Sequence, residues 1–433
     1  MSQPITLAIR SLRLGTLLVL SSAVLASCTG GGGQSFFMLN KNTQAIRRDT
    51  VVPDGVHTFI QNPKDSVNGI IKLAPVDPVP LVQSVLNANG NTKPPFDKKH
   101  MMMLPPGFTM SVYAAELNRP RDMALRDDGT LFYDDFDGKV IAISPDGKQT
   151  TIAEGLSSPH GLEIVNGVLF YTDEQHLYRF EFSSPTAVTG RMQILSDKLP
   201  PGAQHYTRAI RWVPAEKKFY IAVGSSQNKG IEDDNQHGTM LRISDQGGTP
   251  DAATRGGLRD VVAMDVNPNT GELWALDNGT ELLSPVLPPT EVNIIKIGKH
   301  YGWPFFYSQN FRDPDYQDAT PTKYPRFPMG PTPPVIELEA HAEVLGMRFY
   351  TGSAFGNDWH NAMVIAYHSI PKIVRVQANG DGTNARQADV VTGFDDPVNG
   401  VWGRPVSVAI SKDGRTLYIS DDKAGAIYKV TKQ

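Results

Sequence analysis

Glu291 and Tyr301 stand ten residues apart in the segment whose residue types best suit metal chemistry. The strand candidate GELWALDNG, at 271–279, ends in a turn rich in Asp, Asn and Gly, where backbone carbonyls can face a ligand. Glu291 precedes the apolar run 292–297, and Tyr301 opens the sequence Tyr-Gly-Trp-Pro. One carboxylate, loop carbonyls and few competing donors suit a hard cation such as calcium. The alternative interpretation of Glu291 is an exposed carboxylate at a strand end.

These ordered features resemble the glucose/sorbosone dehydrogenase family, soluble sugar dehydrogenases that use pyrroloquinoline quinone (PQQ) and calcium. The resemblance runs from about residue 104 to the C-terminus. It rests on the segment 259–304, on HAEVLGMRFYTG at 341–352, and on WGRPVSVAISKDGRTLYISDDKAGAIYKV at 402–430. It implies oxidation of an aldose or related sugar, with the electrons passed to a separate acceptor.

The resemblance also assigns the calcium ligands. The side chain of Glu291 and the backbone carbonyl of Tyr301 match the positions that bond calcium in the family. The carbonyls at Gly279 and Thr280 match the turn that holds the calcium in contact with the cofactor. Such a calcium polarises the acceptor carbonyl of the quinone.

Two arginines and a histidine are implied in cofactor binding. Arg259 matches an arginine placed against a quinone oxygen, where a guanidinium stabilises developing negative charge. Arg404, in Gly-Arg-Pro-Val, matches a second arginine near the cofactor. His160, in Ser-Ser-Pro-His-Gly, is the second candidate for the catalytic base, after His205. A β-turn explains a histidine at this position without catalysis. We expect His160 to line the channel beside the cofactor.

His205 is the predicted catalytic base, because a histidine can take a hydroxyl proton near neutral pH. The chain has ten histidines. In the family the base stands eight residues before a Gly-Pro-Asp turn, and His205 stands eight before the sequence Val-Pro-Ala that begins at Val213. The residue before it is Gln204, where the family commonly has an acidic residue or histidine. His341, Arg348 and His368 are expected on or near the fifth blade, facing the channel.

Three replacements keep two other functions open. Gln204 precedes the base, Asp260 stands where the family has Asn, and Ser407 where it has Asp. The first alternative is a calcium-dependent propeller lactonase or related hydrolase, since calcium can also polarise an ester carbonyl. The second is a non-catalytic envelope lipoprotein that binds a glycan or protein, because a fold alone does not imply a function.

The first 27 residues resemble a bacterial lipoprotein signal. Arg10 and Arg13 form a positive region, an apolar run follows at 14–25, and Leu-Ala-Ser precedes Cys28, the only cysteine. Cleavage would leave Cys28 lipidated at the N-terminus. The alternative is an ordinary secretory signal with a chance cysteine. We expect a protein anchored on the periplasmic side of the envelope, in the outer membrane, that touches the membrane only through its lipid.

An all-β fold, a six-bladed β-propeller, is predicted for residues 104–433, preceded by a tether and extended arm at 28–103. A turn, an alternating apolar strand, a second turn and another strand recur six times, at 127–143, 165–182, 215–244, 269–297, 357–376 and 412–430. The strand at 108–117 is expected to pair with the last blade and close the ring. The long connections 183–214 and 298–356 are expected to arch over one mouth of the channel.

Composition and missing motifs narrow the function further. The 41 basic and 45 acidic residues give no positive excess for a nucleic-acid partner. The sequence has no GxGxxG motif of a nicotinamide fold, no Walker A, HExxH or GxSxG motif, and no CxxCH haem-attachment site. Electrons must therefore leave through a separate carrier.

Overall fold

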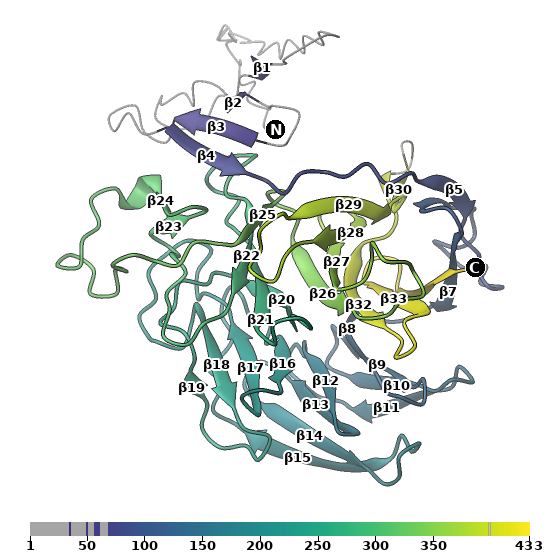
Figure 1. The fold of residues 1–433 in the computed structure, drawn as a ribbon. Helices are drawn as coiled ribbons and strands as arrows, with labels where there is room; N and C mark the ends of the chain where they lie inside the picture. The colour runs from purple at the N-terminus through teal and green to yellow at the C-terminus, as the bar shows by residue number, and fades with distance from the viewer. Residues whose placement is uncertain (1–33, 36–48, 51–55, 61–67, 397, 399) are drawn as a thin grey trace, which may run out of the picture.

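Six four-stranded antiparallel sheets surround a common centre in the computed structural model, which describes residues 34–35, 49–50, 56–60, 68–396, 398 and 400–433. Figure 1 looks along the axis of the ring, with β8, β12, β16, β20, β26 and β32 innermost. The only helical element described is a short 3-10 turn, Pro314–Tyr316. Within the described ranges no helix is both long and apolar enough to cross a bilayer. The predicted six-bladed propeller is confirmed.

Each blade has an inner, two middle and an outer strand. In chain order the blades are β8–β11 (Pro120–Leu125, Leu131–Asp135, Val140–Ile143, Gln149–Ala153), β12–β15 (Leu162–Val165, Val168–Thr172, Leu177–Phe182, Gly190–Ser196), β16–β19 (Ile210–Val213, Lys218–Val223, Thr239–Ile243, Asp251–Ala252), β20, β21, β22 and β25 (Val261–Val266, Leu273–Asp277, Thr290–Ile294, Ile336–Leu338), β26–β29 (Val344–Tyr350, Ala362–Tyr367, Lys372–Gln377, Arg386–Val391), and β32, β33, β34 and β7 (Pro405–Ile410, Thr416–Asp421, Ala426–Lys432, Phe108–Ala114). We number them blades 1 to 6.

The ring closes where β7 pairs antiparallel with β34, from Phe108 opposite Lys432 to Ala114 opposite Ile427. This is the predicted closure, and it leaves no unpaired edge between the first and last blades. The six sequence repeats correspond to the two middle strands of each blade. The long connections are only partly loops: 183–214 contains β15 and β16, and 298–356 contains β25 and β26. The rest of each connection lies outside the blades.

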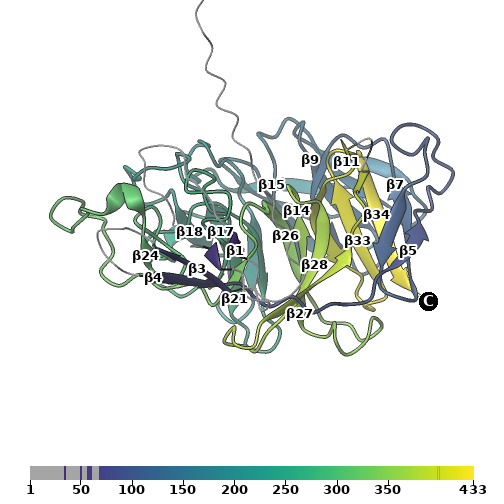
Figure 2. The ribbon, with the colours of Figure 1, turned by 90° about the horizontal axis from the view of Figure 1, so that it is seen from above.

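A strap formed by residues 71–104 holds the outside of blades 4, 5 and 6. Leu73 bridges to Glu337 of blade 4, Val76 bridges to Gln387 of blade 5, and Asn87 bridges to β7. The strap includes the hairpin of β5 (Val82–Val85) and β6 (Met101–Leu104), and Figures 1 and 2 show its chain running around the ring from β4 to β5. Its side chains Leu86, Phe96, Met102 and Leu104 are buried in the core of blades 5 and 6. The C-terminal part of the predicted arm is therefore ordered structure.

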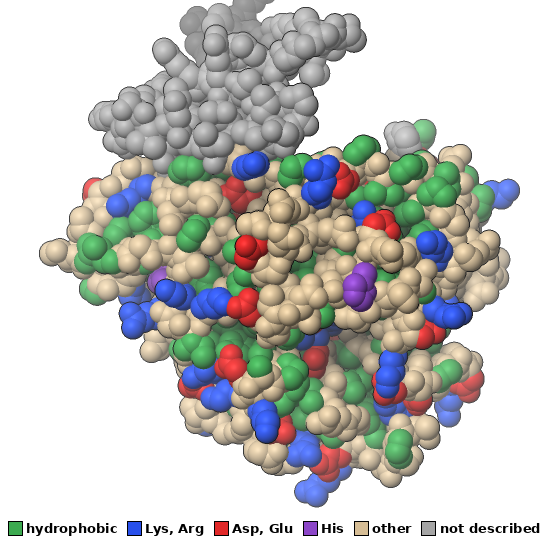
Figure 3. All heavy atoms as spheres, in the orientation of Figure 1, with side chains coloured by type: hydrophobic (Ala, Val, Ile, Leu, Met, Phe, Trp, Pro, Cys, Tyr) green, Lys and Arg blue, Asp and Glu red, His purple; other side chains and the backbone are tan. Residues whose placement is uncertain are grey.

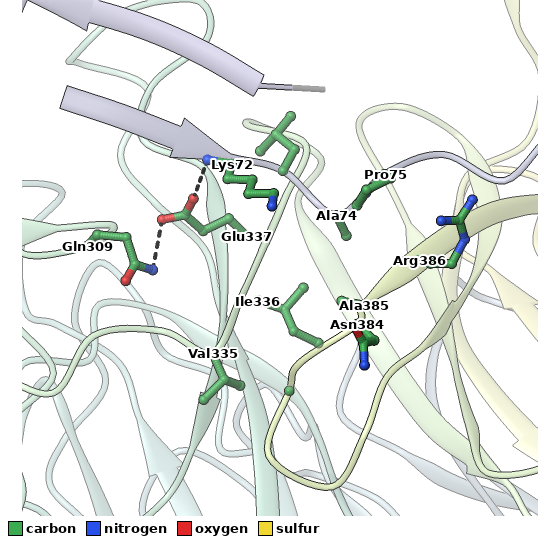
Figure 4. Close-up of a pocket in the computed structure, with 12 residues that line it drawn as sticks. Lys72, Ala74, Pro75, Gln309, Val335, Ile336, Glu337, Asn384, Ala385 and Arg386 are labelled. Carbon is green, nitrogen blue, oxygen red and sulfur yellow. Dashed lines mark hydrogen bonds between the residues drawn. The ribbon is translucent and has the colours of Figure 1, made fainter. Parts of the chain in front are cut away.

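A cavity of about 570 Å³ lies under the strap at the outer rim. Figure 4 shows the strap from Lys72 to Pro75 crossing between Glu337 of blade 4 and Arg386 of blade 5. None of the predicted site residues lines it.

The remaining short strands are β1 (Gln34–Ser35), β2 (Asp49–Thr50), β3 (Val56–Ile60), β4 (Asn68–Lys72), β23 (Phe306–Tyr307), β24 (Phe311–Arg312), β30 (Asp395–Asp396) and β31 (Gly400–Val401).

A repeated aspartate fixes the turns that enter the blades. The five-residue pattern Leu-aromatic-x-x-Asp recurs in four blades, at 131–135, 169–173, 273–277 and 417–421. Asp277 accepts hydrogen bonds from the backbone N–H groups of Arg259 (2.8 Å) and Asp260 (2.6 Å). Asp421 accepts one from the N–H of Arg404, at 2.8 Å. The repeat therefore sets the backbone position of both predicted cofactor arginines.

Charged side chains fill the channel between the inner strands. Ser407, fully buried, donates a hydrogen bond to Asp122 at 2.8 Å, and Arg348 lies 3.5 Å from the same carboxylate. Arg211 pairs with Glu163 and, at 3.5 Å, with an adjacent aspartate, Asp265. A serine at 407 thus has a structural partner inside the ring, and Arg348 faces the channel as expected.

Candidate functional site

The predicted site residues surround one end of the channel, where the inner strands begin; we call it the upper mouth. Side chains and backbone link every neighbouring pair of blades there. The links are Leu162 N to Asp122 (3.0 Å), Thr172 Oγ1 to Arg208 O (2.5 Å), Ser225 N to Arg259 O (2.7 Å), Asn278 Nδ2 to Val344 O (3.0 Å), His368 Nε2 to Asp422 (3.2 Å) and Arg121 to Asp422 (3.4 Å). The mouth is therefore a continuous bonded ring.

A cavity of about 30 Å³ in blade 4, at this mouth, gathers five of the predicted residues. A volume of this size holds one water molecule or one metal ion. Arg259, Gly279, Thr280, Glu291 and Tyr301 all line it. The residues assigned to calcium by sequence therefore meet around one small space.

Three carboxyl groups lie on one face of blade 4. Glu291 of β22 stands opposite Asp277 of β21 and Glu337 of β25, so the three side chains share a sheet face. All three are buried. Burial raises the pKa of Asp277 to about 7, and it raises the pKa of Glu291 and of Glu337 above the usual range. Glu291 accepts a hydrogen bond from Ser308 N at 2.5 Å.

The donor set at Glu291 and Tyr301 fits a calcium ion. Buried Asn293 Oδ1 has no hydrogen-bond partner in the part of the chain described, and Asn293 Nδ2 lies 3.4 Å from the Glu291 carboxylate. Among the described residues no three His, Cys, Asp or Glu side chains gather closely enough to form a metal cluster. The cavity is lined by the carboxyl groups of Asp277, Glu291 and Asp313 and by the turn at 278–280, so a cation here would meet an oxygen-rich, calcium-type donor set.

Arg259 already places positive charge on the neighbouring turn. Its guanidinium, only 7% exposed, donates to the carbonyls of Asn278 (2.9 Å), Gly279 (3.2 Å) and Asn228 (3.0 Å). It also bonds the Asn228 side chain, which Thr280 Oγ1 approaches at 3.4 Å. The Gly279 carbonyl that sequence assigned to calcium is thus held by a guanidinium in this conformation.

His205 lies next to this pocket and is oriented by a residue that sequence reasoning missed. Its Nδ1 lies 3.0 Å from the carbonyl oxygen and 2.9 Å from the hydroxyl of Ser225. A carbonyl can only accept, so Nδ1 carries the proton and Nε2 keeps a lone pair. The N–H of Ser225 donates to the carbonyl of Arg259 at 2.7 Å, which connects His205 to Arg259.

Gly224 allows this close arrangement. A Cβ at that position would lie 2.4 Å from the His205 Cβ, so only glycine fits. Sequence reasoning looked for the orienting group at Gln204, which is exposed. The sequence does contain a signal for Ser225: Gly-Ser at 224–225 follows β17, near the place where four other blades carry the repeated aspartate.

His160 and Arg404 do not line the blade 4 cavity. His160 is 2% exposed, and burial, with help from Arg121 and Arg348, lowers its pKa to about 4. Its Nδ1 has no partner among the residues that the structure describes. Arg404 is 40% exposed and pairs with Asp422 at 3.2 Å. The structure therefore places these two residues at the other side of the upper mouth, and Cys28 lies outside the described residues.

Comparison with known proteins assigns the family. A sequence model described as Glucose / Sorbosone dehydrogenase matches residues 170–429, which is more than half of the chain. The chain belongs to the glucose/sorbosone dehydrogenase family. It is therefore an oxidoreductase that acts on a sugar CH–OH group.

Individual relatives of this glucose/sorbosone dehydrogenase family member are distant. An uncharacterized protein of Borreliella burgdorferi is 26% identical over 350 residues, 76% of this chain and 90% of that protein. An aldose sugar dehydrogenase of Escherichia coli K12 is 25% identical over 232 residues, 49% of this chain and 56% of that protein. The holo form of the pyranose dehydrogenase PQQ domain from Coprinopsis cinerea has a TM-score of 0.63 at 16% identity, covering 80% of this chain and 100% of that one. At this identity the structural likeness establishes the fold.

Proposed function

We propose that the protein is a PQQ- and calcium-dependent dehydrogenase of an aldose or related sugar. The observation that carries the proposal is the chain of contacts at blades 3 and 4. It runs from the imidazole of His205 through Ser225 to Arg259, and Arg259 lines the same cavity as Glu291 and Tyr301. A base, a fixed cation and an oxygen-rich metal pocket thus adjoin one another.

His205 is suited to take the proton of the sugar hydroxyl. Ser225 holds Nδ1–H, which leaves Nε2 as the proton acceptor and fixes the plane of the ring. When bound, PQQ supplies the acceptor for the hydride that leaves the sugar carbon. The electrons then pass to a separate acceptor.

Arg259, Glu291 and Tyr301 would hold the reacting groups in place. The guanidinium of Arg259 is kept rigid by its carbonyl partners and can stabilise negative charge on a quinone oxygen. Glu291 and the Tyr301 carbonyl would bind calcium in the small cavity. Trp303, whose ring centre lies 5.6 Å from the Arg259 guanidinium carbon, limits water on the side facing the cavity.

Cofactor binding is supported by donors at the upper mouth. The buried nitrogens His160 Nδ1, Trp303 Nε1 and Arg404 Nε have no hydrogen-bond partner within the described ranges. Buried polar groups normally have partners. An acceptor-rich anion such as PQQ would provide them, and Asp260, half-buried beside Arg259, is the group that opposes its charge.

The proposal extends to the cell envelope. Its support is the signal-like sequence ending at Cys28, so we propose a lipid-anchored protein facing the periplasm, in the outer membrane. Membrane extraction with detergent and a mass measurement of the mature N-terminus test this part separately. An unlipidated N-terminus would remove it without affecting the catalytic assignment.

The test of the catalytic proposal is reconstitution. We expect purified protein supplied with PQQ and calcium to reduce an artificial dye in the presence of at least one aldose from a panel. Dye reduction should need all three components. Hydrolysis of a lactone with calcium and no quinone would instead select the hydrolase, and the absence of both calcium and PQQ binding would select a non-catalytic binding protein.

A further inference from the structure

Asp422 gathers three cationic side chains at the junction of blades 5, 6 and 1. Its carboxylate lies 3.2 Å from His368 Nε2, 3.2 Å from Arg404 and 3.4 Å from Arg121. His368 follows β27 of blade 5, Arg404 precedes β32 of blade 6, and Arg121 is in β8 of blade 1. One carboxylate thus joins three blades at the place where the ring closes.

The blade repeat does not require an acidic residue at this position. The repeated aspartate of blade 6 is Asp421, which accepts the backbone N–H groups of Arg404 (2.8 Å) and Ala424 (2.7 Å). The residue after the repeated aspartate is Phe136 in blade 1, Glu174 in blade 2 and Asn278 in blade 4. Asp421 therefore explains the turn, and Asp422 needs a reason of its own.

The cluster around Asp422 carries excess positive charge. His368 also pairs with Glu343 at 3.3 Å, and although burial opposes it, the two carboxylates raise the pKa of His368. Arg121, Arg404 and His368, whose protonation the carboxylates favour, then face the carboxylates of Asp422 and Glu343. Arg404 is 40% exposed at the mouth, and its buried Nε lacks a partner in the described structure. An anion arriving at the mouth would find donors and net positive charge.

We propose that Asp422 is a positioning residue that holds Arg404 and Arg121 in the orientation that binds the carboxylates of the cofactor. The proposal rests on the proposed function, because the anion it concerns is PQQ. Two guanidinium groups and an imidazolium repel one another, and a carboxylate between them keeps them together. Arg404 and Arg121 each keep further N–H donors for an incoming carboxylate.

The direction of the effect distinguishes positioning from simple electrostatics. Removing the negative charge of Asp422 would strengthen anion binding if only the net field mattered. If Asp422 positions the arginines, removing its charge lets them separate, and binding weakens. The two explanations predict opposite signs for one variant.

The experiment compares Asp422→Asn with the wild type and with Asp127→Asn. Asp127 is an exposed carboxylate paired with Lys412, with both side chains 74% exposed, so its variant removes the same charge elsewhere. PQQ is titrated into each calcium-loaded protein and followed by its absorbance. We expect Asp422→Asn to bind about tenfold more weakly, the loss of one charge-assisted hydrogen-bond arrangement, and Asp127→Asn to match the wild type.

Equal or tighter binding by Asp422→Asn, with wild-type binding intact, would overturn the positioning role alone. A wild type that binds no PQQ would overturn the proposed function together with this inference. Thermal unfolding shows whether Asp422→Asn is folded, and if it is not, the double-mutant cycle of Arg404→Gln with Asp422→Glu replaces it. Positioning predicts that Asp422→Glu costs less binding in the Arg404→Gln background than in the wild type, because only Arg121 is then left to position; equal costs in both backgrounds would contradict it.

Discussion

In blade 4, three buried carboxyl groups lie side by side on one face of the sheet, whereas at the junction of blades 5, 6 and 1 one carboxylate lies among three cationic side chains. The first region raises the pKa values of its acids, because burial leaves them without enough positive charge. The second lowers the pKa of Asp422: burial opposes the shift, and His368, Arg404 and Arg121 outweigh it.

The difference is one of local charge at a single mouth. Crowded acids favour a cation, and basic groups around one carboxylate favour an anion. The proposed function would use both, one for calcium and the other for an anionic quinone. Figure 3 shows basic and acidic side chains mixed over the visible face, so no separation of charge extends over that surface.

The largest effect is expected from replacing His205, the proposed proton acceptor at blades 3 and 4. We expect His205→Asn to lower kcat by roughly 100- to 10,000-fold, the usual contribution of a general base, with PQQ binding retained. His160→Asn, on the other side of the mouth, should lower kcat by less than about tenfold. Steady-state kinetics with a saturating aldose measure both. The reverse ranking would move the base to His160.

A smaller effect is expected on calcium-dependent stability. Calcium at about a hundredfold excess over its Kd should stabilise the wild type by about 2.7 kcal/mol, seen as a rise in Tm. The same rise should appear in Asp422→Asn and disappear in Glu291→Gln. Calorimetry with and without a chelator measures all three. If the rise in Tm is lost in Asp422→Asn and kept in Glu291→Gln, calcium binds at the junction of blades 5, 6 and 1 and not in blade 4, which would contradict the account.

The smallest effect concerns the protonation of His368. Burial opposes protonation of His368, but the hydrogen bonds that its ring donates to Asp422 and Glu343 outweigh burial and Arg404 and raise its pKa in the folded state. Its contribution to stability is therefore complete below its unfolded pKa of about 6.5 and is lost as the pH rises through the higher folded value. We expect His368→Gln to lower Tm at pH 6 and to differ little from the wild type at pH 9. A difference that does not change with pH would mean that His368 is neutral in the cluster.

The sequence predicted the ring well because the information is local. Each blade repeats an alternating strand pair, and the closing strand at 108–117 is itself alternating. The residues predicted to bind calcium, Gly279, Glu291 and Tyr301, lie close together along blade 4 and line one cavity.

Long-range contacts could not be predicted in the same way. Asp422 and Arg121 are 301 residues apart in sequence and meet only because the ring closes. Ser225 follows β17 and His205 precedes β16, and the two meet because these strands are antiparallel partners; the orienting contact is partly to a backbone carbonyl, which a sequence pattern does not show. The strap at 71–104 has no periodic pattern, because it crosses sheet edges by single bridges and does not form a blade.

The central claim is that this mouth binds a quinone that a sugar can reduce. Its most direct test is to mix the purified protein with PQQ and calcium, desalt it, and record the absorbance before and after adding an aldose. We expect the cofactor to remain with the protein and its spectrum to change to that of the reduced form on addition of the sugar. PQQ that leaves entirely in the small-molecule fraction would contradict the account.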